Sequence, residues 1–403
     1  MIEPFSYKGI WQIPGNEICV AGVLEYTPSQ GIILSIISSF YPDKNLREHI
    51  ENVDEENAML IYGQTVEAKH ITLINCHVKR AQISSNISVP LIEYSCKHML
   101  IGAEYYNVTE TDKFISQVDI HMPFLTYWHM PSETACNYQL SVSDNTIIKL
   151  HSKVIEYPNL IPYYWIKENR RMLTIEARDG VAIVDSLKYA ESLTLFFTFV
   201  AQELSPIYSI HFRDNKKQDI IYYPGKSSYA FPIKQKPRFL FIYDTFKRPE
   251  FTTSLDSILL SWLQYETNLA PIRKHLVTSI INNKQGFLSS NFIILAHAID
   301  GFHRRFRNSK KQRYLERIES LKSEFDDISP IRKLEINAQE IKNSRDYYTH
   351  YFTESEVPSI FNDRELAINA SKLQKLLVCC FLDLLGFTHT EISMILSRYY
   401  PLV

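Results

Sequence analysis

The chain has 403 residues, of which 45% are apolar and 22% charged, and its formal net charge at pH 7 is −2. This length suits two or three domains that each bury a core, and the composition excludes disorder, collagen and coiled coil as descriptions of the whole chain. Glycine accounts for only 11 residues, which is about half its usual share. That scarcity disfavours folds that bind phosphates on several glycine-rich loops.

The cysteines and the first residues favour a cytoplasmic protein without a membrane anchor. Six cysteines are spread along the chain without a C-x-x-C pair, so we expect reduced thiols rather than a disulfide framework or a zinc ribbon. The first residues lack the basic and apolar regions of a signal peptide. The longest apolar runs are shorter than a membrane span.

As far as about residue 245, the pattern favours β-strands. The apolar stretches 18–26 and 32–38 flank a Thr-Pro-Ser-Gln-Gly segment, which predicts a hairpin. The spacing of the later runs, rich in β-branched and aromatic residues, predicts a sandwich or curved sheet. Those later runs are 65–78, 115–121, 146–150, 172–177, 208–212, 219–223 and 238–243.

One segment interrupts the β pattern. Asp185 and Ser186 predict the start of a helix over 187–203, and the Ser-Pro pair at 205–206 predicts its end. The segment is very apolar, so we expect a helix buried against the sheet rather than one that crosses a membrane.

From residue 251 the apolar period becomes helical. Thr253 or Ser254 is expected to cap a first helix that reaches Leu269. Four amphipathic helices with short connections predict a bundle, and hence two domains, a β-rich one over 1–247 and a helical one over 251–403. The later expected helices are 289–307, 330–352, 363–385 with Gly386 as its C-cap, and a short one at 391–398.

The sequence lacks the motifs of several large enzyme classes. It has no P-loop, no dinucleotide-binding fingerprint, no nucleophile elbow and no H-E-x-x-H zinc motif. Its 13 histidines are scattered, and none has a usual metal-ligand spacing to a second histidine or a cysteine. We therefore expect neither a metal nor a cofactor.

The third bundle helix carries an Arg-x4-His motif, formed by Arg345 and His350, with Asp346 directly after the arginine. RNA cleavage without a metal needs such groups. A histidine takes the proton of a ribose 2′-OH or protonates the leaving 5′-oxygen, and an arginine binds the scissile phosphate and stabilises its developing charge.

Helix geometry refines this hypothesis. Residues five apart differ by about 140° around a helix, so Arg345 and His350 do not share a face. Asp346 and His350 are four apart and do share one, so we expect a hydrogen bond that fixes the histidine tautomer and favours its charged form. Arg345 would reach the same cleft from the helix flank or from a second subunit. The alternative is an inert Asp–His pair on a solvated helix face.

Two further groups are candidates for RNA binding. Tyr347 and Tyr351 are four apart and are expected to stack on an unpaired base. A basic cluster follows the second bundle helix, and it either follows a phosphate backbone or is a solvated helix end. Its predicted RNA-binding members are Arg304, Arg305, Arg307, Lys310, Lys311 and Arg313, with Arg317 close behind.

The chain resembles the HEPN superfamily and specifically its ApeA-like abortive-infection proteins. The resemblance lies in the Arg-x4-His motif on the third bundle helix and in the stretches 9–14, 20–26 and 114–129. The resemblance implies a four- or five-helix HEPN bundle behind a long N-terminal domain. It makes Arg345 and His350 the nuclease pair and Asp346 the polar residue after the arginine. It also makes Asp300 the acidic residue of the second helix, although a simple ion pair with Arg304 is the alternative.

The resemblance further implies a metal-independent endoribonuclease toxin of bacterial anti-phage defence, which cleaves cellular RNA, with tRNA as the expected substrate, and leaves a 2′,3′-cyclic phosphate. It implies a homodimer through the helical domain and a phage-derived protein as the trigger, sensed by the N-terminal domain. The alternative is an inactive HEPN-like module for dimerisation or protein binding, behind a ligand-sensing domain.

Overall fold

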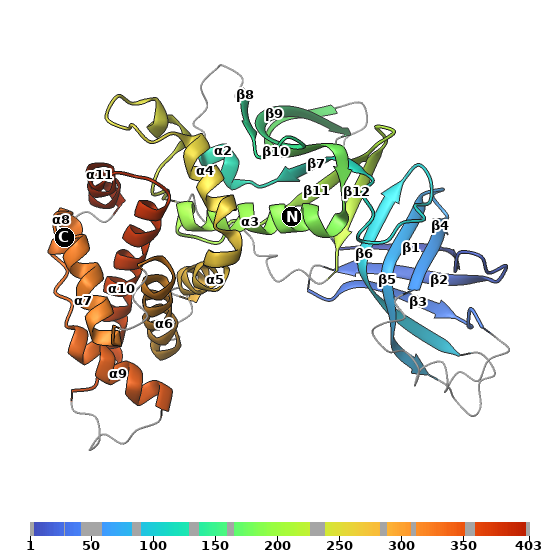
Figure 1. Ribbon diagram of the computed structural model, residues 1–403. Helices are drawn as coiled ribbons and strands as arrows, with labels where there is room; N and C mark the ends of the chain where they lie inside the picture. The colour runs from blue at the N-terminus through green and yellow to red at the C-terminus, as the bar shows by residue number, and fades with distance from the viewer. Residues whose placement is uncertain are drawn as a thin grey trace. The chain divides into compact units, whose positions relative to one another are not determined.

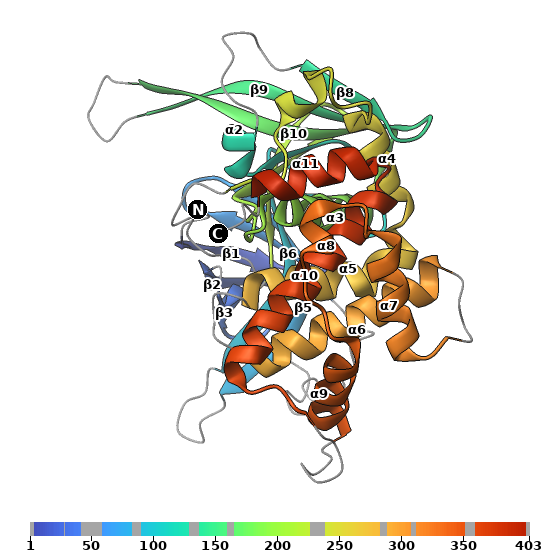
Figure 2. The same ribbon diagram turned by 90° about the vertical axis from the view of Figure 1, so that its left-hand side faces the viewer.

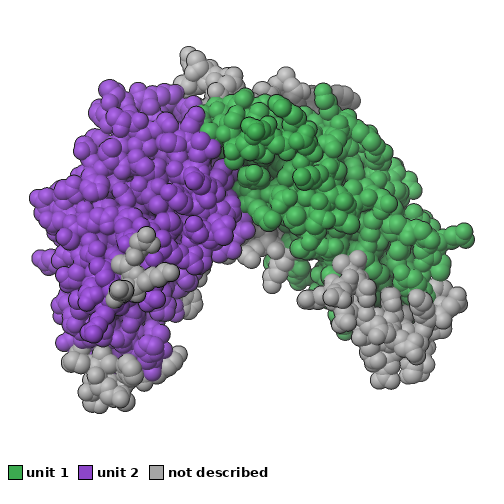
Figure 3. Space-filling model, in the orientation of Figure 1, with its two compact units in different colours: residues 1–123, 133–190, 206–234 green, residues 124–132, 191–205, 235–403 purple. Residues whose placement is uncertain are grey.

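The computed structural model describes residues 4–27, 29–41, 59–82, 90–128, 137–158, 165–225, 238–282, 288–307, 312–350 and 359–399. The chain forms two compact units (Figure 3). The β unit comprises residues 1–123, 133–190 and 206–234, and the helical unit comprises 124–132, 191–205 and 235–403. Each unit is therefore assembled from separate stretches of sequence.

Six strands of the β unit close into a barrel (Figure 1). Their order is β3-β2-β1-β4-β5-β6, and β3 pairs again with β6, so this part of the sheet has no free edge. Trp11 is fully buried in the barrel core, where a side chain at Gly63 would lie 2.1 Å from the Trp11 ring. The strands are β1 (Phe5–Gln12), β2 (Cys19–Thr27), β3 (Gly31–Ile37), β4 (Met59–Thr65), β5 (His70–Gln82) and β6 (Leu91–Gly102).

The same sheet continues in the order β6-β12-β11-β7-β10-β9-β8. Along β7, side chains alternate, so that Val118 and Ile120 are on one face and Asp119 and His121 on the other, and all four are buried. The predicted hairpin and the predicted mainly β, curved-sheet architecture are confirmed. These strands are β7 (Ile115–His121), β8 (Asn137–Ser141), β9 (Thr146–Pro158), β10 (Trp165–Val181), β11 (Ser209–Asp214) and β12 (Asp219–Pro224).

Two sequence predictions in this region need correction. The apolar helix exists as α3 (Ile183–Ala201), but its second half belongs to the helical unit, where Phe196 and Phe199 pack on Trp262. The run 238–243 is not a strand. Its apolar residues pack among helices, with Phe241 on Phe246 and Phe387, and it leads into the 3-10 helix η1 (Tyr243–Lys247).

The helical unit is built around α10, whose second half is almost fully buried and which packs on α6 (Figure 2). The predicted helical bundle is confirmed, and so are the helices expected at 289–307, 363–385 and 391–398. Gly386 follows α10 with a φ of +93°, as a C-cap glycine requires. The helices are α2 (Phe124–Trp128), α4 (Leu255–Gln264), α5 (Glu266–Asn282), α6 (Leu288–Phe306), α7 (Tyr314–Glu324), α8 (Ser329–Arg332), α9 (Ala338–His350), α10 (Asp363–Leu384) and α11 (His389–Tyr399).

Two expected helices are divided in the structure. The first begins at its cap Ser254 but breaks at Tyr265, between α4 and α5. The third is divided into α8 and α9, because Asn337 accepts hydrogen bonds from the backbone N–H groups of Gln339 and Glu340 and so starts a new helix. The sequence did not predict α7, because the helix is mostly polar and buries only a few side chains along one face.

Candidate functional site

Helix α9 has one buried face, and the residues of the Arg-x4-His motif lie outside that face. Ile341, Asn343 and Ser344 are buried, and the Ser344 hydroxyl accepts a hydrogen bond of 2.9 Å from the backbone N–H of Phe361, ahead of α10. This packing turns Arg345 toward α7 and leaves His350 exposed at the end of the helix. The packed face of α9 therefore fixes where the motif lies.

Arg345 is held from two sides. Its Nε donates to a carboxylate oxygen of Asp346 at 2.9 Å, and its Nη2 donates to the same oxygen. Its guanidinium carbon lies 3.9 Å from the ring centre of Tyr314, the first residue of α7. Tyr314 is 7% exposed, and its hydroxyl contacts the carbonyl oxygen of Ala296 on α6 at 3.4 Å. No local pattern in the sequence singles out Tyr314, because its contact with Arg345 depends on how α7 packs.

The expected hydrogen bond between Asp346 and His350 is not formed. Among the described residues, the Asp346 carboxylate bonds Arg345 and, at 3.0 Å, Lys342. Burial raises the pKa of Asp346, but the hydrogen bonds from these two cations outweigh it and lower the pKa. The two cations compete successfully because they bring full charges to the carboxylate.

Asp300 lies on α6 between two arginines. It forms an ion pair of 2.9 Å with Arg304, one turn further along the helix, and a second with Arg317 of α7. Arg317 is only 4% exposed, so this second pair ties α6 to α7. The ion pair proposed as the alternative reading of Asp300 is therefore present, while a role of Asp300 in the chemistry stays a prediction.

His297 lies one turn before Asp300 and joins the two halves of the site electrostatically. Partial desolvation, followed by the charge of Arg345, lowers the pKa of His297 below its usual value of 6.5. His275 and His350 lower the pKa further, and Asp300 raises it. The groups of α6 and α9 thus act on one imidazole within a single chain. The sequence analysis did not select His297.

The members of the basic cluster differ in what they contact. Arg304 and Arg313 are exposed, and Arg305 donates to the carbonyl oxygen of Asn268 at 2.5 Å. Arg307 is bound by Glu324 and Asp383 at 2.6 and 2.7 Å, and although burial opposes it, these carboxylates raise the pKa of Arg307. The charge of Arg307 is therefore already neutralised inside the helical unit.

The remaining predicted RNA-binding residues are described only in part. Tyr347 packs edge-on against Tyr348, with ring centres 5.0 Å apart. Lys310, Lys311 and Tyr351 lie outside the described residues.

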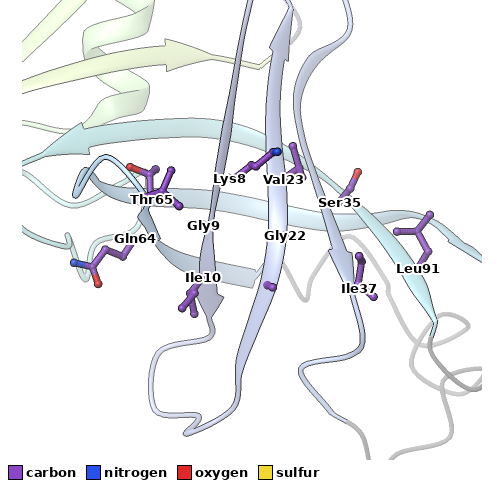
Figure 4. Close-up of a pocket in the computed structure, with 12 residues that line it drawn as sticks. Lys8, Gly9, Ile10, Gly22, Val23, Ser35, Ile37, Gln64, Thr65 and Leu91 are labelled. Atoms are coloured by element: carbon purple, nitrogen blue, oxygen red, sulfur yellow. The ribbon is translucent and has the colours of Figure 1, made fainter.

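A concave feature lies on the barrel, away from these helices in the sequence (Figure 4). It is a groove of about 530 Å³ along β1 to β4 and β6, which we call the barrel groove. Its walls include Ile10, Ile37 and Val66, which are 58%, 64% and 81% exposed. Gly9 and Gly22 line it as well, and a side chain at Gly9 would meet the carbonyl oxygen of Gln64 at 2.5 Å. The barrel groove is thus an apolar surface open to solvent, which the sequence did not indicate.

The described residues contain neither a cluster suited to a metal ion nor a helix suited to a membrane. Within the ranges given above, no three histidine, cysteine, aspartate or glutamate side chains are placed to hold a metal ion. Across the same residues, no helix combines the length and the apolar character that a membrane span requires.

Residues 293–391, most of this helical bundle, match the family model described as Apea-like HEPN. Residues 6–252 match the model described as ApeA N-terminal domain 1. The chain therefore belongs to the ApeA family, a group of HEPN nuclease-type proteins of anti-phage defence. No curated protein and no solved structure matches the chain.

Proposed function

We propose that the chain is a metal-independent endoribonuclease that cleaves cellular RNA, with tRNA as the expected substrate, during abortive infection in the bacterial cytoplasm. The observation that carries the proposal is the setting of Arg345. It is oriented by Asp346 and Tyr314, shares its electrostatic neighbourhood with His350, and lies in the part of the chain that matches the HEPN model.

Arg345 is suited to bind the scissile phosphate. Asp346 occupies Nε and Nη2, while in the described part of the chain no group accepts from Nη1. Tyr314 supports one face of the guanidinium, which keeps its plane fixed. Nη1 would then donate to a phosphate oxygen and stabilise the charge that develops there as the 2′-oxygen attacks. His350, exposed on the same helix, would transfer a proton.

RNA would be held along the exposed part of the basic cluster. Arg304, Arg305 and Arg313 are the described candidates, and Lys310 and Lys311 would extend them. Tyr347 and Tyr351 would stack on an unpaired base. The helical unit would form a homodimer, and the β unit would sense a phage-derived protein that triggers cleavage.

The barrel groove favours a second candidate function. An open apolar surface in the β unit suits the binding of a ligand or a protein partner. The helical unit would in that case serve dimerisation or protein binding without catalysis. Cleavage of RNA by the purified chain separates the two functions.

The test is electrophoresis of total RNA after expression of the wild type, His350→Ala and Arg345→Ala, followed by cleavage with purified proteins with and without EDTA. We expect cleavage by the wild type in EDTA, products with 2′,3′-cyclic phosphate and 5′-hydroxyl ends, and loss of roughly 10²–10⁴-fold in rate without His350. Full cleavage by folded His350→Ala protein would contradict the assignment. Strict Mg²⁺ dependence with 5′-phosphate products would identify another class of nuclease.

A further inference from the structure

We propose that His297 is the second proton-transfer group of this site, acting as the general base on the 2′-OH while His350 protonates the leaving 5′-oxygen. The inference rests on the proposed ribonuclease function and adds to it a catalytic residue and a division of roles. Cleavage by 2′-OH attack needs one group to accept a proton and one to donate a proton, and a single histidine does not do both at once.

The packing of three helices links Arg345 to the turn of α6 that carries His297. Arg345 of α9 lies over the Tyr314 ring of α7 at 3.9 Å, and the Tyr314 hydroxyl lies 3.4 Å from the carbonyl oxygen of Ala296 on α6. Ala296 directly precedes His297. The phosphate-binding guanidinium and the turn of α6 that carries His297 are therefore joined through one side chain. Helices α6, α7 and α9 also pack directly on one another (Figure 2).

The His297 ring is available to a substrate, unlike its neighbours on α6. It is exposed, and within the described residues no side chain hydrogen-bonds it. His303, two turns later, is 1% exposed and thus enclosed in the core. Asp300 is already occupied by Arg304 and Arg317. His297 is thus the titratable group of this part of α6 that is free to take a proton from RNA.

The charges around His297 favour its neutral form, which is the form that a general base needs. Arg345 and His350 of α9 and His275 of α5 all act on it electrostatically. Together with partial desolvation they lower the pKa of His297. Asp300, on α6 itself and paired with Arg304 and with Arg317 of α7, raises the pKa, but the net shift remains downward.

The step balances as follows. An unprotonated ring nitrogen of His297 takes the proton of the 2′-OH, and the 2′-oxygen forms a bond to phosphorus. The bond between phosphorus and the 5′-oxygen breaks, and the 5′-oxygen takes a proton from the His350 imidazolium. The products are a 2′,3′-cyclic phosphate and a 5′-hydroxyl, with His297 protonated and His350 neutral. Proton exchange with water restores both histidines.

The test is the pH dependence of kcat/KM on an RNA substrate for the wild type, His297→Ala and His350→Ala. We expect a bell-shaped wild-type profile, because the base must be neutral and the acid protonated. His297→Ala should lower kcat/KM by about 10²–10⁴-fold and lose the acidic limb, and His350→Ala should lose the basic limb. A merely structural role of His297 would not remove one limb alone.

Two further variants serve as controls. His297→Asn keeps a polar group on α6 and should show the same loss of the acidic limb, which guards against an effect of the small alanine side chain on folding. His389→Asn removes another histidine of the helical unit, one that pairs with Asp327 at 2.8 Å and has no place in the proposed reaction. This variant should keep both limbs and the full rate.

Several results would overturn the inference. Wild-type activity in folded His297→Ala protein, or an unchanged pair of limbs, would show that His297 transfers no proton in the reaction. Loss of the basic limb in His297→Ala would show that the two roles are reversed. A wild-type chain that cleaves no RNA would overturn the ribonuclease function itself. This result can be told apart from a failure of the role proposed for His297, because it is seen with the wild type alone.

Discussion

The β unit and the α6–α9 region of the helical unit differ in how their polar side chains are bonded. In the β unit, His98 is bonded on one side to Tyr222 at 2.9 Å and on the other to Glu110 at 3.0 Å, and Glu110 also accepts from Lys97 and Asn75. Every member of this network has its partner inside the unit. A closed network of this kind holds strands together and leaves little capacity for a ligand.

A second network on β7 and its neighbours is closed in the same way. Thr174 donates to Asp119 at 2.6 Å and contacts a ring nitrogen of His151 at 2.7 Å, while Gln117 donates to Asp119 at 2.8 Å. Around α6 and α9 of the helical unit the arrangement is open. Arg345 is oriented but keeps Nη1 available, and His297 is electrostatically tuned but makes no hydrogen bond with a described side chain. Under the proposed function, this difference separates groups that maintain the fold from groups that take part in RNA cleavage.

A closed network also exists in the helical unit, and breaking it should have the largest effect on stability. Glu391, 1% exposed, accepts hydrogen bonds from the backbone N–H groups of Thr252, Thr253 and Thr388. It therefore ties the start of α11 to the segment before α4. We expect Glu391→Gln to lower the free energy of unfolding by about 1–3 kcal/mol, because buried donors lose a charged acceptor.

The pH dependence of unfolding sharpens this prediction. Burial alone would raise the pKa of Glu391, but the hydrogen bonds lower it from 4.5 to about 2. A carboxylate with a depressed pKa stabilises the fold fully above its unfolded value, and the contribution disappears as the pH falls through the folded value. Urea unfolding between pH 7 and pH 2 should therefore show the wild type converging toward Glu391→Gln at low pH. A constant difference across that range would contradict the prediction.

The second prediction concerns how Arg345 is oriented. We expect Tyr314→Leu to lower cleavage by about 2- to 30-fold, because a cation–π contact contributes about 0.5–2 kcal/mol. Tyr314→Phe keeps the ring and loses only the long contact of the hydroxyl with Ala296, so it should remain within a few-fold of the wild type. The measurement is kcat/KM together with the thermal unfolding midpoint. Equal activities of the two variants would show that the aromatic face has no part in positioning the arginine.

Local patterns in the sequence predicted much of the fold but less of the site. The hairpin, the strand at 115–121 and the helices near 289–307 and 363–385 carry strong local periodicity. Closure of the barrel by β3 and β6 depends on the pairing of strands far apart in the sequence, and no local pattern reports it.

The site shows the same limit at the level of single residues. The spacing of Asp346 and His350 predicted a bond between them, but it could not reveal that Arg345 and Lys342 occupy the carboxylate. The roles proposed for Tyr314 and His297 depend on the packing of α6, α7 and α9. Contacts between helices decide which polar side chains have all their hydrogen-bond partners within the protein and which keep a donor or acceptor for a ligand.

The basic cluster gives the smallest expected effect, and the structure divides it. Arg304, Arg305 and Arg313 are exposed, whereas Arg307 is enclosed by Glu324 and Asp383. Neutralising the three exposed arginines should weaken RNA binding uniformly across sequences. The slope of log affinity against log salt should fall by about 0.7–0.9 for each phosphate contact that is lost. The cleavage position should not change, because phosphate contacts orient RNA without reading its sequence.

Arg307→Ala supplies the matched contrast within the same cluster. It should lower the free energy of unfolding, because Glu324 and Asp383 would lose their shared cation, and it should leave the salt slope of RNA binding near the wild-type value. The two measurements are salt-dependent binding of a labelled RNA and urea unfolding of each variant. The triple variant could instead bind with unchanged affinity and slope while Arg307→Ala alone weakens binding. In that case the enclosed arginine, rather than the exposed ones, contacts RNA. Pairing within the protein would then not distinguish structural from RNA-binding residues at this end of α6.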